Sequence, residues 1–254
     1  MKNEIVEVLS KIEELGYKAY IVGGYPRDFY IGKDSDDYDI CTDAKPEIII
    51  GLFDAIAPEK HGSVKIKYKG ITFDITTFRL ESEYLDVRTP ITAYTTSLEE
   101  DLYRRDFTIN AICMNKEGEY IDLLGGLEDI DSKLIRCIGD PGMKLADDPL
   151  RILRAIRFAT VLDFSIEEEL EKALLTEGIN VAKLSYFRKK EELDRIFNSE
   201  NIVKGIELIR KYNLEEYLEI NFDGVKVIPS ANQMWYQLKY PSNYPFTKNE
   251  KKNI

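Results

Sequence analysis

The chain has 254 residues, of which 44% are hydrophobic and 32% are charged, and its formal net charge is −11. This length allows one large domain or two smaller ones with a sizeable core, and the charge content, without any apolar run of about 18 residues, excludes a membrane-spanning protein. The three cysteines, Cys41, Cys113 and Cys137, lie far apart and form no CxxC pair, which excludes a disulfide scaffold or zinc finger and, with no signal-peptide pattern, indicates a cytoplasmic protein.

Strand and helix signals alternate up to about residue 139. The periodicities and turn residues predict, in chain order, a helix at 4–15, a strand at 17–22, a short helix from Pro26, a strand at 38–42, a helix at 45–53, a hairpin at 64–78 around Lys69-Gly70, and a loop at 80–97.

From Asp140 to Tyr217 almost every stretch has helical periodicity. The predicted helices are residues 148–162, 166–175, 186–197 and 201–212. Strands before and helices after about residue 139 predict a head that combines α and β structure, followed by an all-α region. Residues 221–254 show no clear period, so no regular element is expected there.

Charge is unevenly distributed along the chain. Residues 181–254 hold 13 Lys and Arg against 10 Asp and Glu, a net charge of +3, whereas the first 180 residues hold 22 against 36, a net charge of −14. Polyanion-binding proteins are usually basic overall, so binding of nucleic acid would have to use local arginine clusters and the C-terminal part. The alternative is charge that serves solubility alone.

A Gly-Gly pair, Gly23-Gly24, lies between a predicted strand and a predicted helix. Glycines there let backbone N–H groups approach a phosphate, and Arg27 can supply a guanidinium fork to the same phosphate. A Gly-Gly turn by itself is also an ordinary turn.

Three aspartates form the second candidate group. Alternation along a strand places Asp37 and Asp39 on one face, where two carboxylates repel each other unless a cation lies between them, and hard oxygen ligands favour Mg²⁺. Asp74 lies in a run of β-branched and aromatic residues, and it completes a two-metal centre if its hairpin lies beside the strand of Asp39. The alternative is an exposed sheet edge with charge on its solvent face.

The segment from Arg104 to Ala111 forms the third group. Two arginines are followed by an Asp, a Thr and an Asn, a pattern typical of residues that bind a triphosphate and its ribose. The candidate nucleotide-binding residues in this segment are Arg105, Asp106 and Asn110. A surface salt bridge at the start of a helix explains the same residues equally well.

A charged stripe marks the predicted helix at 148–162. Asp148, Arg151, Arg154 and Arg157 recur every three residues, opposite an apolar stripe that faces the core. Pro149 suits the first helical turn, and an aspartate before it can cap the helix. Such stripes are most often solvated faces.

Taken together, the motifs are similar to those of the class II tRNA nucleotidyltransferase/poly(A) polymerase family, in the DNA polymerase beta superfamily. The matching segments are IVGGYPRD, DDYDI, FDITTFR, EEDLYRRDFTINAI, DLLGGLEDI, IRCIGDP and DDPLRILRAIRFA. The family commonly has Val where Pro26 stands, which removes no ligand. The resemblance implies an α+β fold with a nucleotidyltransferase head, residues 1–139, that has a mixed or antiparallel sheet. An all-α neck, residues 140–198, and the start of a helical body at 199–254, expected to be incomplete, follow it.

The resemblance also implies roles for the candidate residues. Asp37 and Asp39 hold Mg²⁺, with Asp74 as the third catalytic carboxylate. The nucleotide-binding residues are Gly24, Arg27, Arg105, Asp106, Asn110, Asp148, Arg151, Arg154 and Arg157. Asp148 and Arg151 form a protein template for the incoming base, while Arg154 and Arg157 support it and the primer end.

The chemistry of such a template follows from the bases. Cytosine and adenine both present an amine donor beside a ring-nitrogen acceptor, which a carboxylate and a guanidinium match. Uracil and guanine place a carbonyl where the amine would be, and two opposed acceptors with an unpartnered buried charge cost about 2–5 kcal/mol.

The expected activity is addition of CCA to the 3′ end of tRNA from CTP and ATP. The segment FRLESEYLDVRTP, residues 78–90, resembles the flexible loop of CCA-adding enzymes. Poly(A) polymerase and CC-adding or A-adding activity remain open, as do a non-catalytic RNA-binding or nucleotide-sensing module and transfer to a protein or antibiotic. Loss of a metal carboxylate would favour the non-catalytic module, and all three are present.

Overall fold

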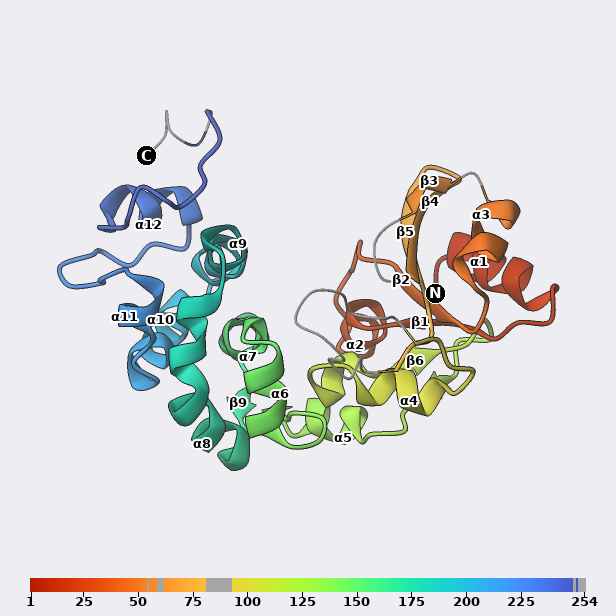
Figure 1. The fold of residues 1–254 in the computed structure, drawn as a ribbon, viewed down its shortest axis with the longest axis horizontal. Coiled ribbons are helices and arrows are strands. Elements are labelled where there is room, and N and C mark those ends of the chain that lie inside the picture. The colour runs from red at the N-terminus through yellow and green to blue at the C-terminus, as the bar shows by residue number, and fades with distance from the viewer. Residues whose placement is uncertain (54, 59–61, 81–92, 249, 251–254) are drawn as a thin grey trace. The chain divides into compact units, whose positions relative to one another are not determined.

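The computed structural model describes residues 1–53, 55–58, 62–80, 93–248 and 250 (Figure 1). The predicted loop at 80–97 falls largely on 81–92 and so lies outside the described residues. The chain divides into two compact units, Met1–Asp131 and Ser132–Ile254. No helix in the described part combines the length and apolar character needed to cross a membrane.

The first unit combines short helices with one mixed sheet, which confirms the expected fold class. Its elements are α1 (Asn3–Glu13), β1 (Ala19–Val22), α2 (Gly24–Tyr30), β2 (Asp39–Thr42), α3 (Pro46–Leu52), β3 (Ala55–Pro58), β4 (Ser63–Tyr68), β5 (Ile71–Thr77), α4 (Leu98–Tyr103), the 3₁₀ turn η2 (Thr108–Asn110), β6 (Cys113–Met114), β7 (Tyr120–Ile121) and α5 (Gly126–Asp131).

The sheet has the strand order β3-β4-β5-β2-β1-β6-β7. Strands β2 and β5 pair in parallel, and the other neighbouring pairs are antiparallel. The predicted hairpin is β4–β5, whose turn residues Lys69 and Gly70 both have positive φ, 47° and 87°. A turn with two left-handed residues matches the twist of the strands it joins, so this turn fixes the register of the pair.

The two faces of the sheet differ in chemistry. One face packs against α1 and α3 and carries the apolar core, which includes Ile21, Ile40, Val64, Phe73 and Ile75. Because side chains alternate along a strand, the residues next to these in sequence point to the opposite face. That second face therefore carries the charged residues of β2, β4 and β5.

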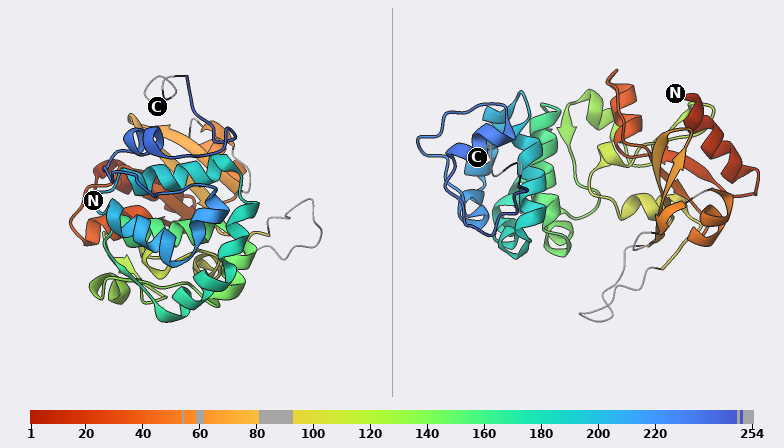
Figure 2. Two further views of the ribbon diagram at one scale, coloured as in Figure 1. Left: turned by 90° about the vertical axis from the view of Figure 1, so that its left-hand side faces the viewer. Right: turned by 90° about the horizontal axis from the view of Figure 1, so that it is seen from above.

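The second unit is almost entirely helical, and its helices pack on one another (Figure 2). Its elements are β8 (Leu134–Ile135), α6 (Pro141–Asp147), α7 (Leu150–Val161), β9 (Ser165–Ile166), α8 (Glu168–Glu177), the 3₁₀ turn η3 (Gly178–Lys183), α9 (Tyr186–Phe197), α10 (Ile202–Lys211), α11 (Leu214–Leu218) and α12 (Ala231–Gln237). The pairing of β8 with β9 is an exception that the helical periodicity did not indicate.

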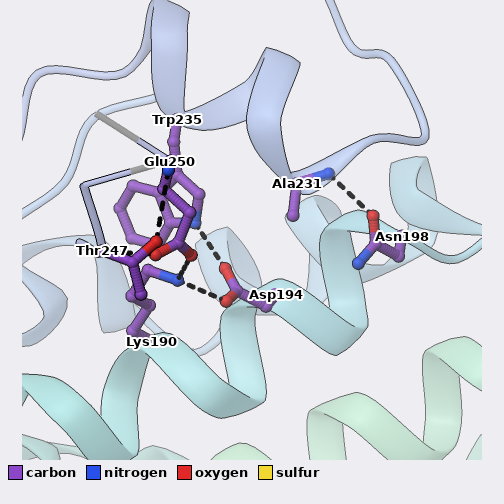
Figure 3. A network of polar contacts seen from close by, with 7 residues as sticks. All are labelled: Lys190, Asp194, Asn198, Ala231, Trp235, Thr247 and Glu250. Carbon is purple, nitrogen blue, oxygen red and sulfur yellow. Dashed lines mark hydrogen bonds and ion pairs between the residues drawn. The ribbon is translucent and has the colours of Figure 1, made fainter. Parts of the chain in front are cut away.

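The C-terminal segment is more ordered than its sequence predicts, because α12 follows a stretch without a clear period. Trp235 on α12 is buried and donates its indole N–H to Asp194 at 2.5 Å. Lys190 bonds both Asp194 at 2.6 Å and Glu250 at 2.7 Å, so one ammonium joins α9 to the chain's end (Figure 3). The segment is therefore held on α9 by an aromatic anchor and an ion-pair network.

This network predicts a pH dependence of stability. Hydrogen bonds from Lys190, and next from Thr247, lower the pKa of Glu250 from 4.5 to about 2. A carboxyl whose folded pKa lies below its unfolded value contributes stability above about 4.5, and the contribution is lost as the pH falls through about 2. Glu250→Gln should therefore lower the free energy of unfolding by about 0.5–1 kcal/mol at neutral pH.

Urea melts of wild type and Glu250→Gln between these pH values check this prediction. The difference in free energy of unfolding between the two proteins should shrink as the solution is acidified. Parallel curves across the whole range would show that the Lys190 pair adds nothing measurable.

Candidate active site

Two of the three predicted carboxylates lie side by side on neighbouring strands. Asp39 on β2 and Asp74 on β5 are register partners, and the Asp74 N–H donates to the Tyr38 carbonyl at 3.0 Å. Ile40 and Ile75 point into the core beneath α1 and α3, so both carboxylates lie on the opposite, polar face. The parallel pairing of β2 with β5 is what brings together residues 35 positions apart.

Gly23 lies next to this pair. Its φ is 83°, and a Cβ added there would be 3.4 Å from Oδ2 of Asp39. A side chain at this position would strain the backbone and would lie in van der Waals contact with the carboxylate. The Gly-Gly turn therefore lies beside Asp39 and needs glycine at Gly23 for its backbone conformation.

Asp37 lies in the extended stretch before β2, and its side chain is exposed. Among the described residues, no three His, Cys, Asp or Glu side chains are gathered closely enough to hold a metal ion. The donor set nevertheless fits a hard divalent cation, since Asp39 and Asp74 present carboxylates from one rung of the sheet.

A lysine that the sequence analysis did not single out faces the same rung. Lys65 on β4 is the register partner of Asp74, and its Nζ lies 3.5 Å from Oδ1 of that carboxylate. Its neighbours Val64 and Ile66 belong to the core, so Lys65 shares the polar face. This pairing could have been predicted from the sequence, because a two-residue hairpin turn at Lys69-Gly70 places Lys65 opposite Asp74.

The second group forms one buried network. Arg27 on α2 donates Nη1–H to the Asn110 side-chain oxygen at 2.5 Å, and Asn110 donates to Asp106 at 3.1 Å. All three residues are at least nine-tenths buried. The structure thus joins motifs 83 positions apart in one polar network behind the Gly-Gly turn.

Arg105 points into a neighbouring ionic cluster around Asp101. The Asp101 side chain is fully buried and pairs with Arg104 at 2.7 Å and with Arg105 at 3.1 Å. Burial alone would raise the pKa of this carboxyl, but the two guanidinium groups hold it below its usual value. Burial, and secondly repulsion from the Arg105 guanidinium, lower the pKa of Arg104 to about 10.

The Asp101 cluster has two consequences for the predicted site. All three groups keep their charges at neutral pH, so the cluster is a fixed ionic unit. Asp101 also accepts the N–H of Arg79 at 3.1 Å, which ties the residues before 81–92 to the same carboxylate. The sequence allowed a surface salt bridge as an alternative for this segment. The structure shows instead that Arg104 and Arg105 pair with the buried Asp101.

The predicted template residues lie where α6 meets α7. Oδ1 of Asp148 accepts the N–H of Leu150 at 3.2 Å, which confirms an aspartate cap before α7. Arg151 donates Nη1–H to the Lys144 carbonyl at 3.1 Å, which fixes its guanidinium beside the end of α6. Arg188 on α9, not anticipated from the sequence, lies 3.7 Å from Oδ1 of Asp148.

The charged stripe on α7 is not one solvated face. Arg157 is buried and pairs with Glu192 on α9 at 2.7 Å, and its guanidinium lies 4.0 Å from the centre of the Phe158 ring. Arg154 also lies over this ring, at 5.2 Å. An α-helix has 3.6 residues per turn, so residues spaced three apart lie at successively different positions around it. The charged stripe therefore starts at the partly exposed Arg151 and ends at Arg157, between α7 and α9.

Comparison with known proteins places these features in a family context. The poly A polymerase head domain matches residues 19–136, and the probable RNA and SrmB-binding site of polymerase A matches residues 163–221. The CCA-adding enzyme of Bacillus pumilus is 40% identical over 216 residues, which are 84% of this chain and 54% of that enzyme.

Two solved structures show the same similarity in three dimensions. The Bacillus stearothermophilus CCA-adding enzyme in complex with CTP has a TM-score of 0.80 and 34% identity, covering 86% of this chain and 54% of that one. The Thermotoga maritima CCA-adding enzyme complexed with tRNA has a TM-score of 0.71 and 28% identity, covering 89% and 53%. The chain thus spans about half the length of the relatives it matches.

Proposed function

Since the chain belongs to the tRNA nucleotidyltransferase/poly(A) polymerase family, we propose that it adds C and A nucleotides to the 3′ end of tRNA. The substrates are CTP and ATP, and pyrophosphate is released. The observation that supports this most is the pair Asp39 and Asp74, in register on the polar face of a sheet that matches the polymerase head. Relatives of this fold are known in complex with CTP and with tRNA.

The carboxylates are the proposed metal ligands. Asp37 and Asp39 would hold Mg²⁺, with Asp74 as the third carboxylate of the centre. Bound there, Mg²⁺ would neutralise charge on the triphosphate and favour the ionised form of the attacking hydroxyl. The chain's own contribution is the register of β2 and β5, which sets the spacing of the carboxylates before substrate binds.

The Arg27 network is the proposed grip on the triphosphate and ribose. Gly24 begins α2, three positions before Arg27, and Asn110, itself bonded to Asp106, orients the Arg27 guanidinium. A pre-oriented guanidinium loses less side-chain entropy when it binds phosphate. Arg105 is proposed to act beside them, held in place by Asp101.

The end of α6 and the start of α7 are the proposed base template. Asp148 would accept the amine of cytosine or adenine, and Arg151 would donate to the ring nitrogen. Arg154 would support the template and the primer end, and Arg157, buried against Glu192, would support the template by holding α7 in place. We also propose the division into a head at 1–139, a neck at 140–198 and the start of a body at 199–254, acting in the cytoplasm.

Primer extension tests this function directly. The purified chain is incubated with Mg²⁺ and a tRNA that lacks CCA, together with CTP alone, ATP alone or both, and the products are separated at single-nucleotide resolution. The proposal expects two additions with CTP and a third when ATP is also present. A long A tract would indicate a poly(A) polymerase. Addition of CC alone or of A alone would indicate a CC-adding or an A-adding enzyme. No extension in any mixture would refute catalysis by this chain.

Salt dependence of tRNA binding is a separate prediction. The basic surplus is small, since residues 181–254 carry a net charge of +3 and the rest is acidic. Phosphate contacts release counterions, so the affinity should be weak and should fall by about 10- to 100-fold between about 50 and 200 mM salt. Filter binding at several salt concentrations measures this, and tight binding near 0.3 M salt would contradict it.

A further inference from the structure

Three charged side chains of three neighbouring strands share one rung of the sheet. Asp39 on β2 is the register partner of Asp74 on β5, and Asp74 is the register partner of Lys65 on β4. The order β4-β5-β2 places Asp74 in the middle. All three lie on the face opposite the apolar core.

This order has an electrostatic consequence. Like charges directly opposite each other on neighbouring strands destabilise a sheet, and an opposite charge across the next pair offsets the cost. The Lys65 Nζ lies 3.5 Å from Oδ1 of Asp74, and about a third of each side chain is exposed (37% and 34%). The ammonium is therefore close enough to orient the carboxylate: it approaches Oδ1, which is buried, while the exposed third of the Asp74 side chain remains accessible to an incoming cation.

We propose that Lys65 is a positioning residue of the metal site: its ammonium orients the Asp74 carboxylate in the metal-free protein and is displaced, in part, by the divalent cation. This rests on the proposed metal role of Asp39 and Asp74. Because the ammonium repels a second cation at the same carboxylate, it also sets an upper limit on metal affinity. An ion that binds too tightly to the free protein would not leave with pyrophosphate, so such a limit suits turnover.

Metal binding without nucleotide or RNA tests the proposal. Mn²⁺ serves as the probe, and its free signal is followed by electron paramagnetic resonance during titration of wild type, Lys65→Met and Lys65→Arg. Lys65→Met should bind Mn²⁺ about three- to tenfold more tightly, because a positive charge next to a dication is removed. Lys65→Arg keeps the charge and should stay near wild type.

The chain offers a matched control in Lys67. It lies two residues along β4 on the same face, is exposed, and has the uncharged Thr72 as register partner. Lys67→Met should leave Mn²⁺ binding unchanged. In an Asp74→Asn background, Lys65→Met should have almost no effect, because the carboxylate through which it acts has lost its charge.

Thermal melting gives a second readout. In EDTA, Lys65→Met should melt about 2–4 °C below wild type, since the like charges at the rung are no longer offset. Saturating Mg²⁺ should close that gap. A general packing defect would lower the melting temperature equally with and without Mg²⁺, and that result would overturn the proposal, as would unchanged or weaker Mn²⁺ binding by Lys65→Met.

One further variant separates this inference from the proposed function. If Asp39→Asn leaves Mn²⁺ binding unchanged, the metal assignment fails and this inference fails with it. If Asp39→Asn weakens binding while Lys65→Met has no effect, the inference about Lys65 fails alone. Lys65→Gln repeats the test with a polar side chain, should Lys65→Met fold poorly.

Discussion

Asp39→Ala is expected to lower nucleotide transfer by about a thousandfold or more while the head stays folded. Asp39 lies on the polar face, partly exposed, so its loss opens no cavity in the core. It does remove one of the two carboxylates that share a rung of the sheet. Because Mg²⁺ gives up its hydration shell reluctantly, loss of one proposed ligand should weaken metal binding, so the chemistry should fail while the packing remains.

Asp36→Ala is the matched control for this variant. Asp36 precedes β2 in the same acidic stretch, and its side chain is 97% exposed. Primer extension should be unaffected in Asp36→Ala and abolished in Asp39→Ala, with closely similar melting curves for both. Activity of Asp39→Ala within about tenfold of wild type would contradict the metal assignment.

Arg151→Ala should lower incorporation of C and A by about ten- to a hundredfold and blunt discrimination against U and G. The change removes a charge-assisted hydrogen bond to the base, worth about 1.5–3 kcal/mol. In the structure the Arg151 guanidinium is fixed by the Lys144 carbonyl beside Asp148, so it is pre-oriented rather than freely solvated. Single-nucleotide incorporation with each of the four NTPs measures the effect.

Arg195→Ala provides the comparison for Arg151→Ala. Arg195 is an exposed arginine on α9 of the same unit, so its loss changes the charge equally. A surface arginine costs under about 0.5 kcal/mol, and its variant should keep both the rate and the preference for C and A. If Arg151→Ala behaves like Arg195→Ala, the template assignment is wrong.

Elements with a strong period were predictable from the sequence. The helix α9 coincides with the predicted 186–197, and α7 and α10 differ from their predictions by one or two residues at each end. The hairpin β4–β5 followed from the Lys-Gly turn. Elements that depend on distant partners were not predictable. The short strands β3 and β6 form by pairing with other strands of the sheet. The helix α12 packs through Trp235 rather than through a periodic apolar face.

The candidate site divides in the same way. The proximity of Asp39 and Asp74 was expected only on the condition that the hairpin lies beside the strand of Asp39, and the register of β2 with β5 meets that condition. The arginine stripe on α7 did not reveal that Arg157 pairs with Glu192 on another helix. Such a tertiary ion pair leaves no mark in the local sequence.

Extension of a CCA-lacking tRNA in an equal mixture of all four NTPs, with the added nucleotides read by sequencing the 3′ ends, decides whether this chain selects C and A without a nucleic-acid template. With Mg²⁺, this chain is expected to add C, C and A in that order and to exclude U and G, as the proposed Asp148–Arg151 template requires. Products that contain U or G at frequencies comparable to C and A, or a tRNA left unextended, would contradict it.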